Sequence, residues 1–326
     1  MNSPFPASSS APGEGKLVVE LLPQKTSALS TITSQYPLKL ISPSPQSYQK
    51  SVLVFFLTYG GGLVGGDQVH LTIDVKANSK LSIVTQGHTK IFKSPSSDVV
   101  TRQQLQVTLE AGAAVCLLPD PVQPFKGSVY EQSQIFTLHE TASLCLLDWV
   151  SAGRIARGED WDFSAWSGRN EVWAAEPKAR LLLRDNVILE GDEIDAQDKK
   201  LEKKMHNLDI FGTLVLRGPL VENLAAFLLA EFAALPRLKA QDFRSQAKID
   251  RDLKTNLSQH EIWRRARLEQ ELGCGLLWSA AKIRGCIVVK FGSLTVEGAR
   301  TWIGNMIKEQ GSVEKTFGES AIMCIK

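Results

Sequence analysis

The 326-residue sequence is poor in cysteine and histidine, and neither type is arranged as a metal or disulfide motif. Its five cysteines lie far apart and include no CxxC pair, which disfavours a disulfide framework and a structural zinc site. An odd number of dispersed thiols fits a reducing compartment. No two of the five histidines stand at HxH or helical spacing, so no high-affinity metal site is evident in the sequence.

The sequence also lacks a charge excess and a long apolar run. Lys and Arg total 37 against 35 for Asp and Glu, and a net charge of +2 gives no reason to expect a nucleic-acid or membrane partner. The longest apolar segment, residues 224–235, is interrupted by Glu231 and is too short to span a bilayer. Residues 1–16 are rich in Pro, Ser and Gly without the pattern of a secretory signal. We expect a cytoplasmic chain in which residues 1–16 form a disordered tail.

Signatures of nucleotide binding and of serine hydrolysis are missing as well. A phosphate loop needs a Lys-Ser/Thr pair and a following helix, whereas the densest glycine segment is followed by Asp67 and a strand-like run. No GxSxG motif is present. The segment predicts a strand crossing with positive φ angles or bulges, or a place where another protein's backbone approaches. Its glycines are Gly60, Gly61, Gly62, Gly65 and Gly66.

Strand-like patterns dominate the first two thirds of the chain. An apolar content of 43% is sufficient for a large core. From about residue 17 to residue 189, short β-branched runs alternate with turn-forming residues. Residues 69–75 alternate between apolar and polar, whereas residues 51–57 are largely apolar and predict a strand covered on both faces. The sequence therefore predicts a mainly β fold.

A weak internal repeat indicates how the strands stack. Residues 75–81, 109–115 and 138–144 each read as a strand, a tight turn and a second strand. Such units cannot bury their own apolar faces, so we expect them to stack in layers. Ser82, Cys116 and Cys145 then occupy equivalent positions, as do Thr85, Pro119 and Asp148. Cys116 and Cys145 are interpreted as neighbouring core thiols, and polar loops leaving the stack after Thr85, Pro119 and Asp148 would form a site on one rim.

The last third of the chain changes character. Residues 220–235 predict a mostly buried helix, and residues 294–309 carry apolar side chains at helical spacing. Between them, residues 237–260 are polar and read as an insertion or a surface helix. We expect one β-rich domain over residues 17–326, with a layered strand architecture and two α-helices in its C-terminal third.

Dispersed polar residues offer weak coordination at most. A borderline cation such as nickel accepts imidazole and carboxylate ligands, and the candidates are Asp67, His88, Asp120, Asp148 and Glu159. For each residue alone, a capping or salt-bridging role is the simpler interpretation. Pro119 and Pro121 predict a rigid loop. Arg154 and Arg157, near tryptophans, suit a surface network or a protein interface.

Four motifs, in this order, resemble the urease accessory family UreD, called UreH in some bacteria. They are GGGLVGGD (60–67), TQGHTKIFKS (85–94), LPDPVQPF (118–125) and GRIARGE (153–159). The resemblance spans roughly residues 18–190 and weakens toward the C-terminus. It implies a layered β fold with two helices and a non-enzymatic chaperone role. A family member binds apo-urease, joins the helical accessory protein UreF and the GTPase UreG, and helps nickel(II) reach the urease active site.

The resemblance further implies an internal polar passage for nickel(II) in transit, without a tightly bound cofactor. Carried onto matching positions, the residues that line or support the passage are Asp67, Thr85, Gln86, Asp120, Asp148 and Glu159. His88 stands where the family more often has a small residue, and is either an added nickel ligand or a surface substitution. Two other classes remain open: a β-rich hydrolase using Asp and His in a cleft, and a protein-interaction module without metal.

Overall fold

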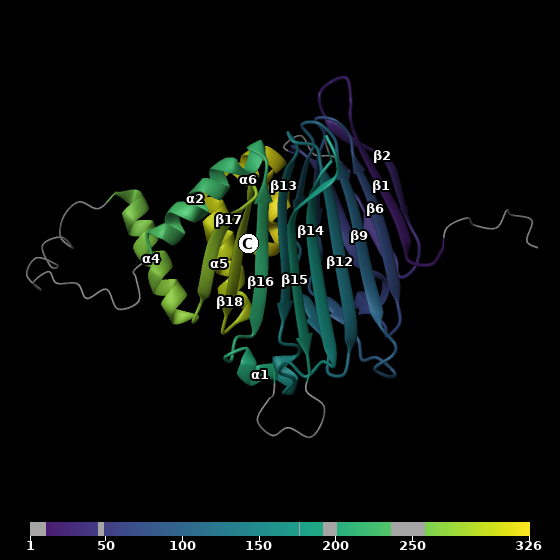
Figure 1. The fold of residues 1–326 in the computed structure, drawn as a ribbon, viewed down its shortest axis with the longest axis vertical. Helices are drawn as coiled ribbons and strands as arrows, with labels where there is room; N and C mark the ends of the chain where they lie inside the picture. The colour runs from purple at the N-terminus through teal and green to yellow at the C-terminus, as the bar shows by residue number, and fades with distance from the viewer. Residues whose placement is uncertain (1–10, 45–48, 176, 192–200, 236–257) are drawn as a thin grey trace, which may run out of the picture.

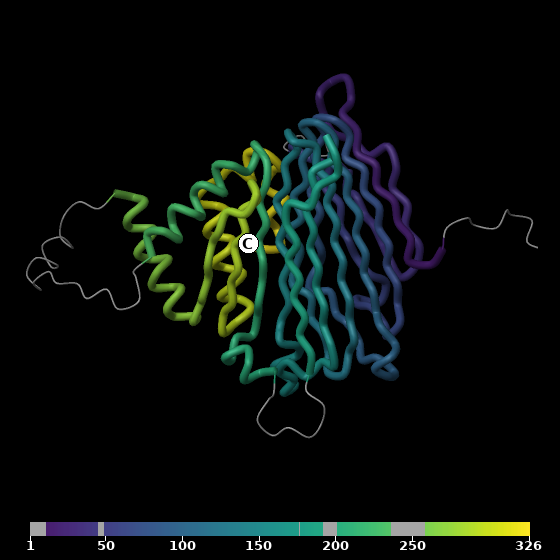
Figure 2. The backbone as a smooth tube through the Cα atoms, viewed as in Figure 1, coloured from purple at the N-terminus to yellow at the C-terminus, as the bar shows by residue number. Residues whose placement is uncertain are grey.

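Two β-sheets pack face to face, and helices cover the outer face of one of them (Figure 1). The computed structural model describes residues 11–44, 49–175, 177–191, 201–235 and 258–326. The mainly β class with stacked strands is confirmed. The tube in Figure 2 shows the helical part of the chain gathered at one side, away from the seven-stranded sheet.

The seven-stranded sheet has the order β15-β14-β12-β9-β6-β1-β2. Its strands are β1 (Glu14–Leu21), β2 (Ser27–Ser34), β6 (Gln68–Val75), β9 (Thr101–Leu109), β12 (Val129–Leu138), β14 (Ala165–Ala174) and β15 (Arg180–Glu190). The five central strands run parallel, with one antiparallel strand at each edge. β1 begins at Glu14, so residues 14–16, expected in the tail, belong to the sheet because they pair with β6 and Gly15 and Lys16 also pair with β2.

The 11-stranded sheet has the main order β17-β18-β16-β13-β10-β7-β4-β3. Its strands are β3 (Leu38–Ile41), β4 (Val52–Thr58), β5 (Gly62–Leu63), β7 (Lys80–Val84), β8 (Thr89–Ile91), β10 (Ala114–Leu117), β11 (Val122–Pro124), β13 (Ser143–Ser151), β16 (Ile210–Arg217), β17 (Leu277–Ile283) and β18 (Cys286–Ser293). Every residue of β13 is buried, because this strand is covered on both faces.

The register of the internal repeat is confirmed. β7, β10 and β13 are parallel neighbours, and Cys116 pairs with both Ser82 and Cys145. Each repeat unit crosses from the seven-stranded to the 11-stranded sheet through a tight turn, two of which place Asn78 and Gly112 at positive φ. Both thiols are fully buried, and burial raises the pKa of Cys116 well above its ordinary value. They are core thiols, as the sequence indicates.

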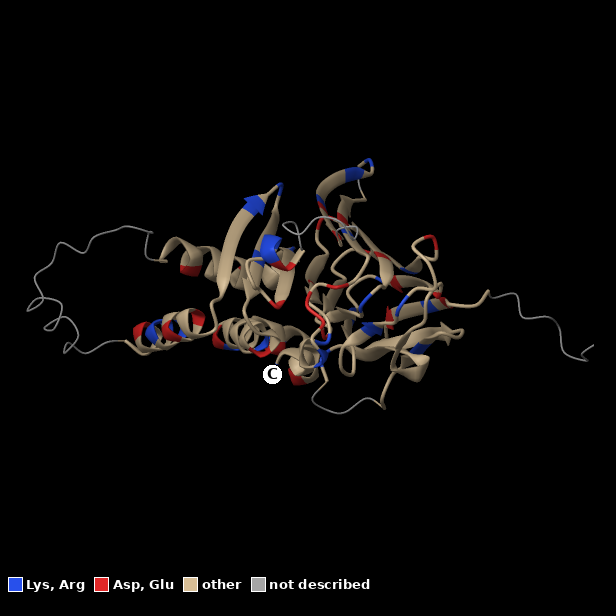
Figure 3. Cartoon of the chain, turned by 90° about the horizontal axis from the view of Figure 1, so that it is seen from below, with Lys and Arg blue, Asp and Glu red and all other residues tan. Residues whose placement is uncertain are grey.

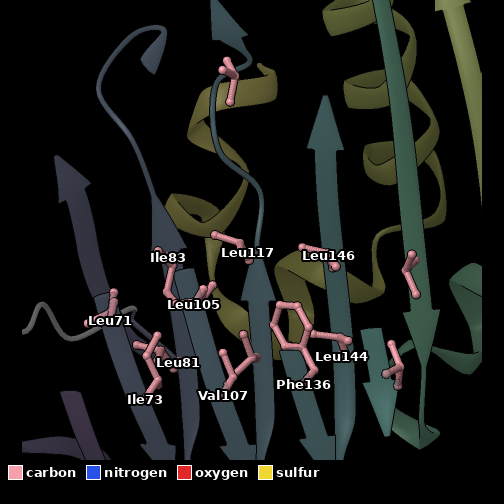
Figure 4. Packing of buried hydrophobic residues seen from close by; sticks show 14 of the residues in the cluster. Leu71, Ile73, Leu81, Ile83, Leu105, Val107, Leu117, Phe136, Leu144 and Leu146 are labelled. Carbon is pink, nitrogen blue, oxygen red and sulfur yellow. The ribbon is translucent and has the colours of Figure 1, made fainter. Parts of the chain in front are cut away.

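Two apolar cores share the 11-stranded sheet. The first lies between the sheets, and Figure 4 shows buried side chains meeting there, among them Leu71, Ile73, Leu81, Ile83, Leu105, Val107, Leu117, Phe136, Leu144 and Leu146. The second lies between the 11-stranded sheet and the helices, where Trp149, Phe291 and Trp302 pack together. Strand alternation separates them: Leu146 and Trp149 point to opposite cores.

The helices are α1 (Leu201–Lys204), α2 (Glu222–Ala233), α4 (Gln259–Gly273), α5 (Val296–Gln310) and α6 (Ser312–Phe317), with 3₁₀ turns η1 (Tyr59–Gly61), η2 (Ile155–Arg157), η3 (Pro219–Val221) and η4 (Glu319–Ile325). The two expected helices are present as α2 and α5. The expected count of two was too low, because α4 and α6 are also helical. Most of the polar segment 237–260 lies outside the described residues, and its last residues begin α4, where Ser258 and Glu261 form a capping box.

An ionic network explains how the polar helix α4 packs on apolar neighbours. Glu231 on α2 is 1% exposed. Its carboxylate is hydrogen-bonded to Nε of Arg264 at 2.9 Å and to Nε2 of His260 at 2.9 Å. Arg267 also bonds Glu231, and it pairs with Glu271, which accepts the indole N–H of Trp302 on α5. Each buried charge thus has a partner. Within the described residues, none of the helices is both long and apolar enough to cross a membrane.

Candidate functional site

The four sequence motifs lie side by side at one rim of the sandwich. β5 pairs with β8, β8 with β11, and β11 with the end of β13. Nε2 of Gln123 then donates to the carbonyl of Gly153 at 3.0 Å, which joins the last motif to the row. The parallel order of the strands brings these loops together, because equivalent strand ends meet at one edge.

The centre of this rim is a hydrogen-bonded pair, Thr85 and Asp120. The backbone N–H of Asp120 donates to Oγ1 of Thr85 at 2.7 Å, and the Thr85 hydroxyl donates back to Oδ2 of Asp120 at 3.0 Å. The N–H of Gly87 adds a third bond to Oδ2 at 2.9 Å. Both side chains are buried, so the carboxylate is held in one orientation.

Arg300 and Cys324, from the C-terminal part of the chain, complete the pair. Nη1 of Arg300 on α5 donates to Oδ1 of Asp120 at 2.8 Å and also to the carbonyl of Cys324 in η4. The Cys324 thiol donates to the carbonyl of Thr85 at 3.4 Å. Burial, reinforced by the charge of Asp120, raises the pKa of this thiol to about 12, so Cys324 is protonated at neutral pH.

Thr85 and Asp120 separate two cavities. An open groove of about 430 Å³ lies outside them, walled by Phe55, Leu57 and Met323. A much smaller inner cavity of about 30 Å³ lies between the sheets and extends to Asp148. Thr85 and Asp120 line both spaces. The inner cavity has room for about one water molecule.

Asp148 lies inside the sandwich rather than in a loop. The sequence places it where a strand ends, but β13 continues to Ser151 because β16 pairs along it. Its carboxylate accepts hydrogen bonds from Nε2 of Gln132 at 2.8 Å and from Nδ2 of Asn170 at 2.6 Å. Burial raises the pKa of Asp148, and the two amide hydrogen bonds partly offset that effect.

Asp148 belongs to a band of polar side chains that crosses the apolar interior. In the 11-stranded sheet, Asp148 neighbours Thr213, which neighbours Lys290. In the facing sheet, the corresponding row is Gln134, Asn170 and Asp185. We call these residues, with Gln132, the polar seam; its members are Gln132, Gln134, Asp148, Asn170, Asp185, Thr213 and Lys290.

Hydrogen bonds between the facing rows hold the far half of the polar seam. Thr213 donates to Oδ2 of Asp185 at 3.0 Å, and Nζ of Lys290 donates to Oδ1 of Asp185 at 2.7 Å. The side chain of Lys290 is 37% exposed, whereas that of Asp185 is 12% exposed. The polar seam therefore runs from the inner cavity beside Asp120 to the protein surface at Lys290.

Asp67 and Glu159 lie outside this arrangement. Oδ2 of Asp67 accepts the N–H of Val64 at 2.8 Å, so Asp67 caps the turn that its own glycines form. Glu159 pairs with Arg154, whose hydrogen bonds and charge hold the pKa of that carboxyl below its usual range. The Arg154 guanidinium stacks on Phe125 at 3.9 Å. These contacts fix the rim loops, and neither carboxylate lines the two cavities described above.

The glycine run has the structural character that its composition indicates. Gly60, Gly61 and Gly66 have φ angles of 73°, 74° and 93°. At Gly62 an added Cβ would lie 2.6 Å from the carbonyl oxygen of Lys90. The β8 backbone can therefore lie this close to residue 62 because that residue has no side chain. Gly65 is similarly crowded, with Pro95 at 2.7 Å from an added Cβ.

The remaining candidates are spread along the rim. Gln86 is exposed and lines the open groove. His88 is half-buried, and burial together with the nearby charge of Arg300 lowers its pKa. The Pro119 carbonyl accepts the indole N–H of Trp149 at 2.9 Å, and the Pro121 carbonyl accepts the N–H of Thr89. Arg157, in η2, is exposed.

Sequence reasoning missed Arg300, Cys324 and the amides of the polar seam. A signal for the amides was present: Gln132 and Gln134 occupy the inward phase of β12, where Tyr130 and Phe136 are also buried. Arg300 offers no comparable signal, because its partner Asp120 is remote in sequence. Among the described residues, no three His, Cys, Asp or Glu side chains gather to hold a metal ion.

The fold and site define a two-sheet β scaffold with a polar band through its interior. A family model described as UreD urease accessory protein matches residues 11–322. The chain therefore belongs to the UreD urease accessory protein family.

Individual relatives agree with this membership. The chain is 32% identical to a protein named uncharacterized urease accessory protein ureD-like from Schizosaccharomyces pombe, over 92% of this chain and 94% of that one. It is 29% identical to urease accessory protein 4 of Cryptococcus neoformans var. grubii, over 89% and 88% of the two chains. Urease accessory protein D of Arabidopsis thaliana is 32% identical over 63% of this chain and 67% of its own length.

Proposed function

We propose that this protein is a non-catalytic scaffold of urease maturation whose polar seam conducts nickel(II) toward apo-urease. In this proposal it acts in the cytoplasm, in a complex with apo-urease, a UreF-like helical protein and a UreG-like GTPase. Membership in the UreD family supports the role in urease maturation. Nickel is a cargo here and is held by no permanent site.

The observation that carries the proposal is the surroundings of Asp148. This carboxylate is buried between the sheets, and among the described residues its hydrogen bonds come from amides and not from a cationic side chain, so a passing cation meets an unpaired carboxylate. The amide oxygens of Gln132 and Asn170 accept from the Tyr130 hydroxyl and from Nε2 of Gln134, and each keeps a second lone pair. Once the amides turn toward it, a borderline divalent ion can exchange water ligands for these oxygens and the carboxylate.

The dimensions of the interior fit conduction better than storage. The inner cavity holds about one water molecule, so a hydrated ion would exchange most of its water for side-chain oxygens. The dispersal of the carboxylates supports weak, sequential contact instead of tight binding. The hydrolase alternative needs two titratable groups in reach of each other, and the partners of Asp148 are amides.

The test is urease activation in cells that carry Asp148→Asn. The substitution removes the interior charge at almost constant volume, so we expect urease activity at limiting nickel to fall several-fold. Asp67→Asn is the matched control, because Asp67 lies on the rim outside both cavities and an amide oxygen can still accept the bond from Val64. Capture of the UreF-like partner by both variants establishes that the scaffold is intact. Equal activation by both variants would refute conduction through the polar seam.

A further inference from the structure

Both ends of the polar route finish in a carboxylate that a cationic side chain covers. At the rim, Arg300 binds Asp120, and their side chains are only 16% and 9% exposed. At the far end, Lys290 binds Asp185. Between them Asp148 has no direct cationic partner among the hydrogen bonds of the described residues. Along the route, the two terminal carboxylates are each paired with a cationic side chain, and the carboxylate between them is not.

The position of each cation makes it an obstacle to another cation. Nη1 of Arg300 lies on Oδ1 of Asp120, and Arg300 also lines the open groove. An ion arriving from the groove meets the guanidinium before it reaches the inner cavity. Like charges repel strongly in partly buried surroundings, and Oδ1 is already occupied. Lys290 stands in the same relation to Asp185 at the far surface.

We propose that Arg300 and Lys290 are electrostatic latches that close the two ends of the polar seam to divalent cations until each is displaced. The inference rests on the proposed function for its biological meaning. Its physical content concerns only the access of a cation to Asp120 and Asp185, which can be measured without urease.

Arg300 has a second position prepared for it. Glu297 lies one helical turn earlier on α5, with its carboxylate 3.6 Å from Nε of Arg300 and its side chain 78% exposed. The guanidinium can turn toward Glu297 when it leaves Asp120, so opening does not strand a charge. Besides Asp120, the Cys324 carbonyl of η4 and the Trp149 ring, 5.8 Å from Cζ of Arg300, hold the guanidinium in place. Moving η4 away from α5 therefore weakens the latch.

The contact between η4 and α5 depends on Gly304. A Cβ added there would lie 2.0 Å from the carbonyl oxygen of Ile325, so Gly304→Ala must push η4 away. This variant disturbs the latch while leaving Arg300 in place. It provides an independent way to open the rim end.

The experiment measures Ni²⁺ binding to the full chain by equilibrium dialysis. Arg300→Met and Lys290→Met each free a carboxylate, and we expect each to bind Ni²⁺ on the order of tenfold more tightly than the natural chain. Lys76→Met is the matched control, since its exposed pair with Glu110 lies away from both ends, and it should change nothing. Adding Asp120→Asn to Arg300→Met should return binding to the original level, as should Asp185→Asn with Lys290→Met.

Each outcome decides for or against the latches. Unchanged binding in Arg300→Met and Lys290→Met, with near-ultraviolet circular dichroism matching the natural chain, overturns them. A gain that survives Asp120→Asn overturns the rim assignment, because the ion is then held elsewhere. If Arg300→Met fails to fold, Gly304→Ala supplies the rim test and should also tighten binding. Loss of activation in Asp148→Asn with no gain in the latch variants would retain conduction and reject the latches.

Discussion

Two aspartates beside the same inner cavity have opposite electrostatic surroundings. Asp120 is bound by the guanidinium of Arg300, whereas Asp148 is bound by the neutral amides of Gln132 and Asn170. A neutral donor satisfies the lone pairs of a carboxylate without cancelling its charge. The same residue type is therefore paired with a cation in one place and left with its charge unpaired in the other, which is the difference on which the proposed conduction and latches depend.

Cys324 gives a prediction at the residue scale. Its pKa is raised from the ordinary 9.0 to about 12, so the reactive thiolate is almost absent near pH 8. In the folded chain we expect a thiol reagent to modify Cys274 first, because it is the one partly exposed thiol, and to leave Cys324 unmodified. Mass spectrometry of the labelled peptides checks this.

The same shift has a consequence for stability. Above pH 9 the unfolded thiol ionises while the folded thiol keeps its proton, so the free energy of unfolding falls as pH rises toward 12. Cys324→Ser provides the comparison, since a serine hydroxyl does not titrate in this range.

The labelling experiment can also contradict the structure. If Cys324 were labelled as fast as Cys274, the buried contact with Thr85 would be wrong.

How far the site could be predicted depends on the range of the interactions. Thr85 and Asp120 could be placed near each other from the repeat register, because Thr85 is equivalent to Pro119, the residue before Asp120. Asp67 was misplaced because a turn aspartate can satisfy its own loop as well as face a cavity. Arg300 could not be found, since the packing of α5 on the sheet depends on tertiary contacts that no local pattern records.

At the scale of elements, the same contrast separates the strands from the helices. The stacked units were predictable because their alternation survives in each strand. Helix α4 was missed because its composition is polar. Its contacts with α2 come from Trp263 and from charged residues, so it lacks an apolar stripe. Its capping box, Ser258 and Glu261, was the available signal.

The network beneath α4 yields an element-scale prediction. Glu231→Gln leaves Arg264 and the fully buried Arg267 without their shared carboxylate. Leaving a buried charge without any partner costs about 3–5 kcal/mol, and the cost is smaller here because Arg267 keeps its pair with Glu271 and the side chain of Arg264 is 31% exposed. We expect the free energy of unfolding, measured with urea, to fall by about 1–3 kcal/mol.

The control for this prediction is Glu269→Gln. Glu269 is on the exposed face of α4, so its neutralisation should change stability by less than about 0.5 kcal/mol. A similar loss of unfolding free energy in both variants would mean that removing any acidic charge near α4 destabilises the protein. The buried pairing with Glu231 would then not be the cause.

At the scale of the whole molecule, the 11-stranded sheet joins the two cores into one unit. Its residues belong to both apolar clusters, with alternate positions of β10 and β13 facing each. Loss of either core exposes the other, so we expect a single cooperative unfolding transition. Tryptophan fluorescence tests this, because both cores contain tryptophans, Trp161 and Trp166 between the sheets and Trp149 and Trp302 beneath the helices, and cooperative unfolding requires one common transition.

Two resolved transitions, or a calorimetric enthalpy well above the van't Hoff value, would contradict that expectation and indicate separable halves.

Charge is not expected to drive the association of the whole molecule. In Figure 3 the acidic and basic segments are interspersed, and neither sign forms a continuous band in that view, in keeping with a net charge of +2.

The long separation in sequence between Asp120 and Arg300 has a consequence for biosynthesis. β7 and β10, which place Thr85 and Asp120, are translated well before α5. The two sheets can therefore begin to form on the ribosome while the rim carboxylate still lacks its arginine. Under the proposed latch, a nascent chain at that stage has an uncovered Asp120, and the rim closes to metal only after α5 has been translated.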